Sequence, residues 1–319
     1  MVAPIALKNI VYMMMKISKG ENNMPNFIML VGIPAVGKDT WAREYVKKHP
    51  DTIIHSSDDI REELYGDASH QGSPIKVFEL MRSRTLRDLR AGKDVIYNAT
   101  NIKYKDRKSI LSQLKKIDNL TCYCKIFVAP VEVCKERNAK RDRAVPDFVY
   151  DKMLRAWQTP CEWEGFDKIE VVYTADKDNA YKYIHQMIGF DQKNHHHQYD
   201  LYDHCCKAAL KLGHMCFNNN NDLVFIRGLM DTLLLHDVGK LFTQTEPDEN
   251  GNCHYYNHDN IGAYIALACG LPLFGSQLIT YHMLPYMKDI KGLETWKKRM
   301  GSYFIHWLDI FHVCDMTGH

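Results

Sequence analysis

Two groups of residues have types and spacings suited to chemistry on phosphate. The first is the stretch Gly32-Ile33-Pro34-Ala35-Val36-Gly37-Lys38-Asp39-Thr40, which follows the apolar run Phe27–Val31. The glycines let backbone N–H groups turn toward an anion, and the helical pattern from Trp41 onward adds a partial positive charge at its start. Lys38 can reach the β- and γ-phosphates of a nucleotide. The order of strand, glycine-bounded loop and helix therefore predicts a phosphate-binding loop.

The end of this loop departs from the usual pattern. Asp39 stands where a Ser or Thr hydroxyl normally contacts Mg²⁺, and Thr40 follows it. Asp39 can hold the ion through water, repel the nucleotide or pair with Lys38, and Thr40 can supply the hydroxyl instead. The sequence leaves these alternatives open.

The second group is an ordered set of histidines and aspartates in the last third of the chain. Its members are His204, the doublet His236-Asp237, His258, His282 and Asp315. Imidazole and carboxylate together suit divalent transition metals such as Mn²⁺, Fe²⁺, Co²⁺ or Ni²⁺. The doublet ends an apolar run, Leu233–Leu235, so a buried helix can present it. A lone histidine is usually structural, and the histidines outside this order are set aside: His214, His254, His306 and His312.

The loop is embedded in alternating strand and helix patterns. Strands are expected over residues 27–31, 52–55, 94–99, 121–128 and 169–173. Helices are expected after the loop, over 75–90, 105–116 and 131–143, from Pro146, and up to about Ile188. This alternation predicts an α/β domain with a parallel sheet and helices on both faces.

Beyond a polar interruption at Asp191–Asn194, only helical patterns remain. They cover residues 201–212, 223–235, 260–269 and 297–314, which predicts an all-α second domain. We therefore expect an N-terminal extension over residues 1–25, the α/β domain over 26–189 and the helical domain over 190–319. The run His195-His196-His197 reads as part of a polar linker, or as a contact to a substrate phosphate.

Composition restricts the class of protein. The formal net charge of +2 gives no global basic field, so any nucleic-acid contact must come from local patches. The ten cysteines have no metal-finger spacing and suit reduced thiols in a cytoplasmic protein. Apolar runs fall short of the ~20 residues that a membrane span needs. The sequence says nothing about the oligomeric state.

Four motifs in register resemble the 5′-kinase domain of bacteriophage polynucleotide kinase. They are the loop, Asp58-Asp59-Ile60-Arg61, Asn98-Ala99-Thr100-Asn101, and the stretch from Glu136 to Pro146. The resemblance covers roughly residues 26–175. It implies a P-loop kinase that uses ATP with Mg²⁺. Asn98 departs from that family, because related kinases often have an acid there.

The resemblance also implies roles for individual residues. Asp58 matches the general base that takes the proton of a 5′-hydroxyl. Arg61 matches the residue that holds the acceptor phosphate, and Arg141 matches the lid arginine that stabilises the transferring phosphoryl group. Arg137 would lie on the same helix face as Arg141 and contact the nucleotide. Taken singly, Ser57 and Asp58 could merely cap a helix, and the arginines could form a solvated face.

The histidine set resembles the HD-domain metal-dependent phosphohydrolases over residues 195–319. His204, His236, Asp237 and Asp315 match the core ligands of that family. His258 and His282 match the extra pair of two-metal members, and Lys240 matches a lysine that faces the scissile phosphate. The resemblance implies one or two divalent ions at this site, acting on a phosphoester.

Together the two resemblances imply an enzyme that heals broken RNA. One half would phosphorylate a 5′-hydroxyl end, and the other would hydrolyse a 2′,3′-cyclic phosphate or a related phosphoester. An RNA ligase is the partner implied, and the choice between RNA and DNA stays open. Two other hypotheses remain: a nucleoside or metabolite kinase joined to a nucleotidase, and an ATP-sensing module that regulates the phosphohydrolase half without phosphoryl transfer.

Overall fold

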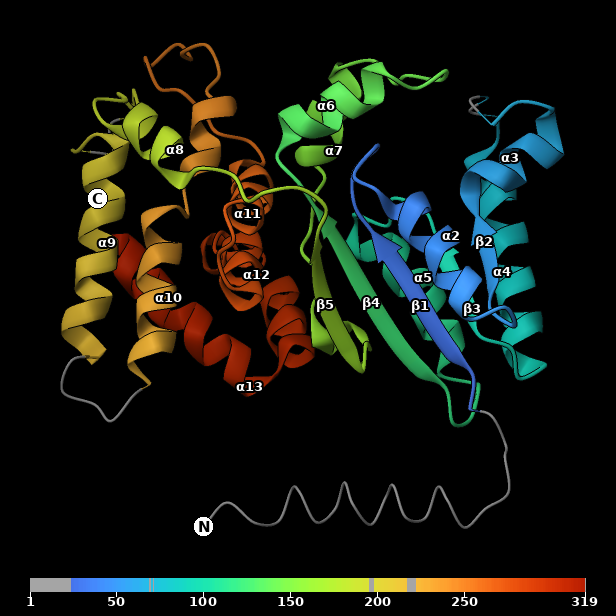
Figure 1. The fold of residues 1–319 in the computed structure, drawn as a ribbon. Coiled ribbons are helices and arrows are strands. Elements are labelled where there is room, and N and C mark those ends of the chain that lie inside the picture. Colours follow the sequence, from blue (N-terminus) through green and yellow to red (C-terminus); the bar gives the residue numbers. More distant parts are fainter. Residues whose placement is uncertain (1–23, 69, 71, 195–197, 217–221, 319) are drawn as a thin grey trace.

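The computed structural model describes residues 24–68, 70, 72–194, 198–216 and 222–318 (Figure 1). Most of the N-terminal extension expected over residues 1–25 lies outside the described residues, as does the run His195-His196-His197. All ten cysteines fall within the described ranges and are free thiols. Of the helices in those ranges, none has the length and apolarity that crossing a membrane requires.

Five parallel strands form one sheet in the order β2-β3-β1-β4-β5 (Figure 1). They span β1 Asn26–Val31, β2 Ile53–Ser56, β3 Val95–Asn98, β4 Thr121–Val128 and β5 Lys168–Tyr173. The central strand β1 is apolar and almost wholly buried, as is typical of a parallel sheet covered on both faces. Because all strands run in one direction, their carboxyl ends meet at one edge of the sheet, where open α/β sheets bind ligands.

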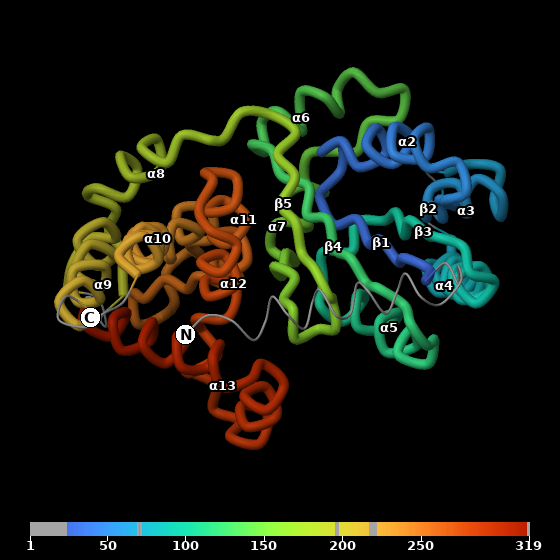
Figure 2. The backbone as a smooth tube through the Cα atoms, turned by 60° about the horizontal axis from the view of Figure 1, so that its bottom comes forward, coloured from blue at the N-terminus to red at the C-terminus, as the bar shows by residue number. Residues whose placement is uncertain are grey.

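Helices cover both faces of this sheet, as the sequence predicts. They are α2 Lys38–Lys48, α3 Ser57–Tyr65, α4 Pro74–Arg90, α5 Tyr104–Leu114, α6 Val131–Ala139, α7 Phe148–Leu154, the short η1 Glu162–Glu164 and α8 Ala180–Met187. Figure 2 shows α2 on one face and α4 and α5 on the other. The expected helix over 131–143 is too long, since α6 ends at Ala139. Residues 140–143 are all exposed, so no buried face holds a further turn.

The second half is helical. It contains α9 Leu201–Cys216, α10 Leu223–Leu234, η2 Val238–Phe242, α11 His258–Ala268, α12 Leu273–Tyr281, η3 Leu284–Tyr286, α13 Ile290–Asp315 and η4 Met316–Gly318. Helix α12 was not expected. Its residues from Gly275 to Tyr281 are all buried, so no polar face produces a helical period in the sequence. Helix α13 begins earlier than expected and is interrupted at Gly301, whose φ is +79°.

The two halves share one continuous hydrophobic core, which runs from Phe27 in β1 to Cys314 in α13. Trp157, fully buried after α7, meets Tyr264 of α11 edge to face with ring centroids 5.0 Å apart. The Tyr264 hydroxyl donates to the Ala129 carbonyl at the end of β4, at 2.8 Å. The boundary expected at residues 189 and 190 therefore stays a prediction from composition, because the packing is continuous across it.

Candidate active sites

The first site lies at the carboxyl edge of the sheet, where β1 leads through the loop into α2. Three contacts from other strands and helices fix the loop backbone. The Gly32 N–H donates to the Thr100 carbonyl at 3.0 Å, the Thr174 hydroxyl donates to the Val36 carbonyl at 2.7 Å, and the Tyr150 hydroxyl donates to the Pro34 carbonyl at 3.4 Å. These bonds hold the loop backbone in place from three sides.

Both glycines of the loop are required by its geometry. A Cβ on Gly32 would lie 2.8 Å from Val36 Cγ1 and 3.0 Å from the Phe127 carbonyl oxygen. Gly37 has φ +102°, and its Cβ would meet Thr174 Cγ2 at 3.3 Å. Any other residue at these positions would therefore distort the turn.

Lys38 occupies the centre of the loop. Its side chain is buried, and its Nζ donates to the Gly32 carbonyl at 2.8 Å and the Ile33 carbonyl at 2.9 Å. Burial lowers the pKa of the Lys38 ammonium to about 8, although Asp39 and Asp58 act in the opposite direction. The Lys38 ammonium therefore has two neutral acceptors, and a phosphate oxygen could accept its third N–H.

Asp58 and Arg61 stand beside this loop at the start of α3. The helix is capped by Ser56, whose hydroxyl accepts from the N–H groups of Asp58 at 3.2 Å and Asp59 at 3.4 Å. The alternative that Ser57 and Asp58 form the cap is wrong. Since Ser56 satisfies these donors, the half-exposed Asp58 carboxylate is available to accept from Arg61 Nη1 at 2.7 Å. Arg61 Nε is buried and has no hydrogen-bond partner within the described ranges.

The arginines of the basic stretch are placed differently from the expectation. Arg137 donates to the carbonyl and hydroxyl oxygens of Thr174, at 2.5 and 3.1 Å, and so supports the loop from behind. Arg141 follows the end of α6, so the two arginines do not share a helix face and that expectation is wrong. The charge of Arg141 is nevertheless close enough to lower the pKa of Lys38.

The two residues that depart from the usual kinase pattern are in direct contact. Asn98 Nδ2 donates to Asp39 Oδ1 at 2.6 Å, from the end of β3 to the first turn of α2. Lys38, by contrast, donates to loop carbonyls, so Asp39 is not its hydrogen-bond partner.

The second site is buried among the helices of the second half. Its ligand candidates come from helix ends, apart from His204 within α9. His236 and Asp237 follow α10, His258 begins α11, His282 follows α12, and Asp315 ends α13. Helix ends suit this purpose because each one aims a side chain inward while its helix packs in the core.

Three of these histidines have the same orientation. Nδ1 of His236, His258 and His282 each lies 2.7 Å from the carbonyl oxygen three residues earlier, of Leu233, Tyr255 and Ile279. A carbonyl accepts, so each Nδ1 carries the proton and each Nε2 presents a lone pair toward the centre. Metal-binding histidines in proteins are commonly fixed in this way.

Asp237 divides the cluster into two parts. Its Oδ1 lies 3.1 Å from His258 Nε2 and 3.4 Å from His282 Nε2. Its Oδ2 lies 3.3 Å from His204 Nε2 and 3.5 Å from His236 Nε2. Two ligand groups therefore share one carboxylate: His204, His236, Asp237 and Asp315, and Asp237, His258 and His282.

The charges of this cluster are compatible with bound cations. Burial disfavours ionised carboxylates, yet Lys240 and the histidines hold the pKa of Asp237 well below its usual range. Hydrogen bonds from His204 and His236 do the same for Asp315. Burial lowers the pKa of His204, but Asp237 and Asp315 outweigh it and raise that pKa to about 9. Two buried anions surrounded by imidazoles fit divalent ions.

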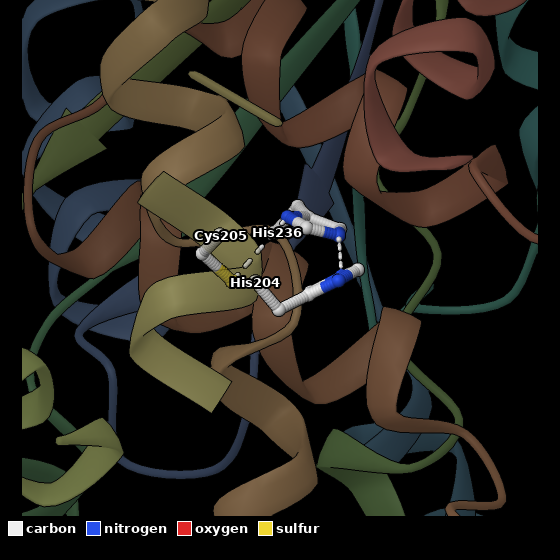
Figure 3. Close-up of side chains that lie close together, drawn as sticks. All are labelled: His204, Cys205 and His236. Carbon is white, nitrogen blue, oxygen red and sulfur yellow. Dashed lines mark hydrogen bonds between the residues drawn. The ribbon is translucent and has the colours of Figure 1, made fainter. Parts of the chain in front are cut away.

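Cys205 lies next to this cluster, with its Sγ 3.6 Å from His236 Nδ1 (Figure 3). That nitrogen already donates to the Leu233 carbonyl, and burial raises the pKa of the Cys205 thiol well above its usual range. His204, Cys205 and His236 form a third group that could hold a metal, but it contains no carboxylate, so we base the metal site on the two groups that share Asp237.

Two further residues at this site were missed in the sequence. Gln192, buried in the segment interpreted as a linker, accepts from Lys240 Nζ at 2.8 Å, while Lys240 also lies 2.7 Å from Asp237 Oδ2. The Tyr286 hydroxyl donates to Asp315 Oδ2 at 2.9 Å. Neither residue lies in a motif. For Gln192, the polar segment around it was the one signal in the sequence, and Tyr286 had no such signal.

Comparison with known proteins bears on the first half of the chain. Residues 27–160 match the family model described as an AAA domain. This region contains the loop, Asp58, Arg61, Asn98 and α6, and the match together with its parallel sheet supports a P-loop, kinase-like fold.

One curated protein and two solved structures illustrate the likeness. The chain is 25% identical to the L-seryl-tRNA(Sec) kinase of Methanococcus maripaludis, over 52% of this chain and 66% of that protein. A chain of the Pnkp1/Rnl/Hen1 complex is 23% identical, over 41% of this chain and 44% of the other, with a TM-score of 0.33. A fungal RNA kinase is 11% identical, over 66% and 49% of the two chains, with a TM-score of 0.38. The chain thus spans less than two thirds of the length of each.

Proposed function

We propose that this protein heals broken nucleic-acid ends through two activities. The first half would phosphorylate 5′-hydroxyl ends with ATP, and the second would hydrolyse 2′,3′-cyclic phosphate or related phosphoester ends. The observation that supports this proposal is the presence of two sites in one chain. One is a phosphate-binding loop beside the Asp58–Arg61 pair. The other is the buried Asp237 carboxylate, with histidines next to both of its oxygens. Cleaved RNA carries both kinds of end, and a ligase would need both of them converted.

In the kinase half, Lys38 and the loop N–H groups would hold the ATP phosphates. Asp58 would take the proton of the acceptor hydroxyl as its oxygen attacks the γ-phosphorus and ADP leaves. Arg61, whose Nε lacks a partner among the described residues, would hold the acceptor phosphate. Arg141 would stabilise charge on the transferring group. Mg²⁺, when bound, would neutralise charge on the phosphate oxygens.

The second half is proposed to be an HD-type phosphohydrolase. The two ligand groups that share Asp237 would each hold one divalent ion, such as Mn²⁺, Fe²⁺, Co²⁺ or Ni²⁺. Such a pair supplies an activated water and a clamp for phosphoryl oxygens. Lys240, buried beside Asp237, would contact the substrate phosphate, and Tyr286 would orient Asp315.

The deciding experiment uses one RNA with a 5′-hydroxyl and a 2′,3′-cyclic phosphate. The RNA is incubated with the full-length protein, ATP, Mg²⁺ and Mn²⁺, and both ends are resolved. We expect a 5′-phosphate and a hydrolysed 3′ end. Lys38→Ala should abolish only the 5′ reaction, and Asp237→Asn only the 3′ reaction. If wild type changes neither end, the proposal fails.

Three phosphate acceptors, tested in parallel, distinguish the alternative functions. A 3′-nucleotide tested against a decamer distinguishes a small-molecule kinase from an end-healing enzyme. Seryl-tRNA is a second candidate acceptor, because the curated relative is a kinase named for that substrate. ATP binding without single-turnover transfer to any acceptor would instead support an ATP-sensing module.

A further inference from the structure

The contact between Asp39 and Asn98 joins two positions that normally serve the same metal ion. Asn98 is the last residue of β3, which pairs directly with the loop strand β1 so that Asn98 lies opposite Leu30. Asp39 is the second residue of α2 and is exposed, whereas Asn98 is 5% exposed. P-loop enzymes generally hold Mg²⁺ between a hydroxyl at the start of this helix and a carboxylate on a strand.

In this chain the charged and the neutral residue have exchanged places. We propose that Asp39 is the protein carboxylate directed at the Mg²⁺ of bound nucleotide, and that Asn98 is its positioning residue. The site thus keeps one negative charge, which comes from Asp39 on α2 and not from a residue on the strand. This inference rests on nucleotide binding by the proposed kinase half, and it does not depend on the acceptor.

The hydrogen bonding agrees with this assignment. Asn98 occupies Asp39 Oδ1, while Asp39 Oδ2 has no protein partner among the residues the structure describes. The hydrogen bond from Asn98 fixes the carboxylate and leaves its Oδ2 available to a cation. Hard cations such as Mg²⁺ are bound by carboxylate oxygens of this kind.

The surrounding charges also favour a cation next to Asp39. Burial raises the pKa of Asp59, and the neighbouring carboxylates of Asp58 and Asp39 raise it further. Several carboxylates therefore converge beside one buried lysine, and that lysine bonds with loop carbonyls. The simpler explanation is that Asp39 only stabilises the start of α2. It predicts no metal dependence.

The geometry also explains why the exchange must be paired. A carboxylate at position 98 would place two anions at the 2.6 Å distance now bridged by an amide N–H. Such pairs share a proton or move apart, because both members cannot ionise at that separation. Asn98 is therefore the residue that Asp39 requires.

The test compares Asp39→Ser, Asn98→Asp and the double variant, with Mn²⁺·ADP as the probe. Electron paramagnetic resonance measures bound Mn²⁺, and ADP affinity is measured with and without Mg²⁺. We expect each single variant to reduce the metal-dependent gain in ADP affinity by at least about tenfold. The double variant should recover to within a few fold of wild type, because it restores the hydroxyl-and-carboxylate arrangement.

Two controls make the result decisive. Glu44→Ser replaces an exposed carboxylate by a hydroxyl on the same helix and should change nothing. Thr40→Ala should lose less than Asp39→Ser. The inference is overturned if Asp39→Ser keeps the metal dependence, if Thr40→Ala loses as much, if the double variant is no better than the singles, or if wild-type ADP affinity is independent of metal. None of these readouts requires an acceptor, so an inactive kinase would overturn only the proposed function.

Discussion

In the proposed kinase half, nucleotide binding should depend on Lys38, and the protonation of this lysine should set a pH limit. Burial lowers its pKa to about 8, so part of the free protein carries a neutral amine above that pH. Bound phosphates favour the charged form and raise the pKa in the complex. ADP binding should therefore take up protons near pH 8.5, and affinity should fall as pH rises past about 8.

Calorimetry in two buffers of different ionisation enthalpy measures this uptake. Lys38→Arg is the control, because a guanidinium stays charged throughout the range and should remove the proton uptake. Identical heats in both buffers for the wild type would contradict the prediction.

Gln192 is a residue whose importance only the packing reveals. Its side chain accepts from Lys240, which also pairs with Asp237. We expect Gln192→Leu to lower kcat/KM of the proposed phosphoesterase reaction by about tenfold, because it removes a hydrogen bond to a buried charged group, worth about 1.5–3 kcal/mol. Metal content, measured by mass spectrometry, should stay unchanged because Gln192 touches no ligand in either metal group directly.

A matched change checks the specificity of that effect. Gln113→Leu alters a partly exposed glutamine on α5 and should leave the proposed phosphoesterase activity unchanged. A loss of metal in Gln192→Leu would show that the residue supports the ligands and not the lysine.

The candidate residues of both sites could be selected from the sequence because spacing and residue type carry chemistry locally. Gly32–Thr40 has the loop pattern, and His236-Asp237 ends an apolar helix. The Asp39–Asn98 contact could not be predicted, because it joins residues 59 positions apart whose meeting depends on strand order. Gln192 was missed for a related reason: polar segments between helices resemble linkers, whether or not they are buried.

At the scale of elements, the histidine and aspartate cluster depends on a close approach of η2 and α11. A Cβ on Gly239 would lie 2.0 Å from the His258 carbonyl oxygen and 2.9 Å from the Gly262 nitrogen. Gly239→Ala must therefore push the start of α11, and His258 with it, away from Asp237. We expect loss of one metal equivalent and of phosphoesterase activity, with destabilisation of about 1–3 kcal/mol.

Gly213→Ala is the matched control, since its new methyl group would meet only the flexible end of Met230 at 3.2 Å. That variant should bind metal normally and unfold at or slightly above the wild-type temperature. Equal metal content in the two variants would argue against the prediction.

Helices were predicted correctly where a segment has one polar and one apolar face, and they were missed or misjudged in length where it lacks that pattern. Helix α4 starts within a residue of its expected position and ends as expected, because its buried and exposed sides alternate with helical spacing. Helix α12 is buried on every side and has no such period. Helix α6 ended early because charged residues offer nothing to bury beyond Ala139.

At the scale of the whole molecule, a buried hydroxyl network joins the two halves. Thr159 Oγ1 accepts from Trp157 Nε1 at 3.0 Å and lies 2.8 Å from Ser276 Oγ and 2.9 Å from Thr280 Oγ1. Thr159→Val would leave these groups without a common partner and should cost about 1–3 kcal/mol. Because the core is continuous, we expect one calorimetric unfolding transition that moves down as a unit.

Thr295→Val, on the exposed side of α13, should leave the transition unchanged. Two resolved transitions, with only one of them shifted in Thr159→Val, would mean that the halves unfold independently despite their shared core.

The Asp39–Asn98 contact also has a consequence for ancestry. One arrangement has a hydroxyl at position 39 and a carboxylate at position 98, and the other has Asp39 and Asn98. Single substitutions from one to the other must pass through a chain with carboxylates at both positions or at neither. Because both intermediates would bind the metal poorly, we expect the two positions to be inherited together although 59 residues separate them. Homologues should therefore carry one arrangement or the other, and mixtures of the two should be rare.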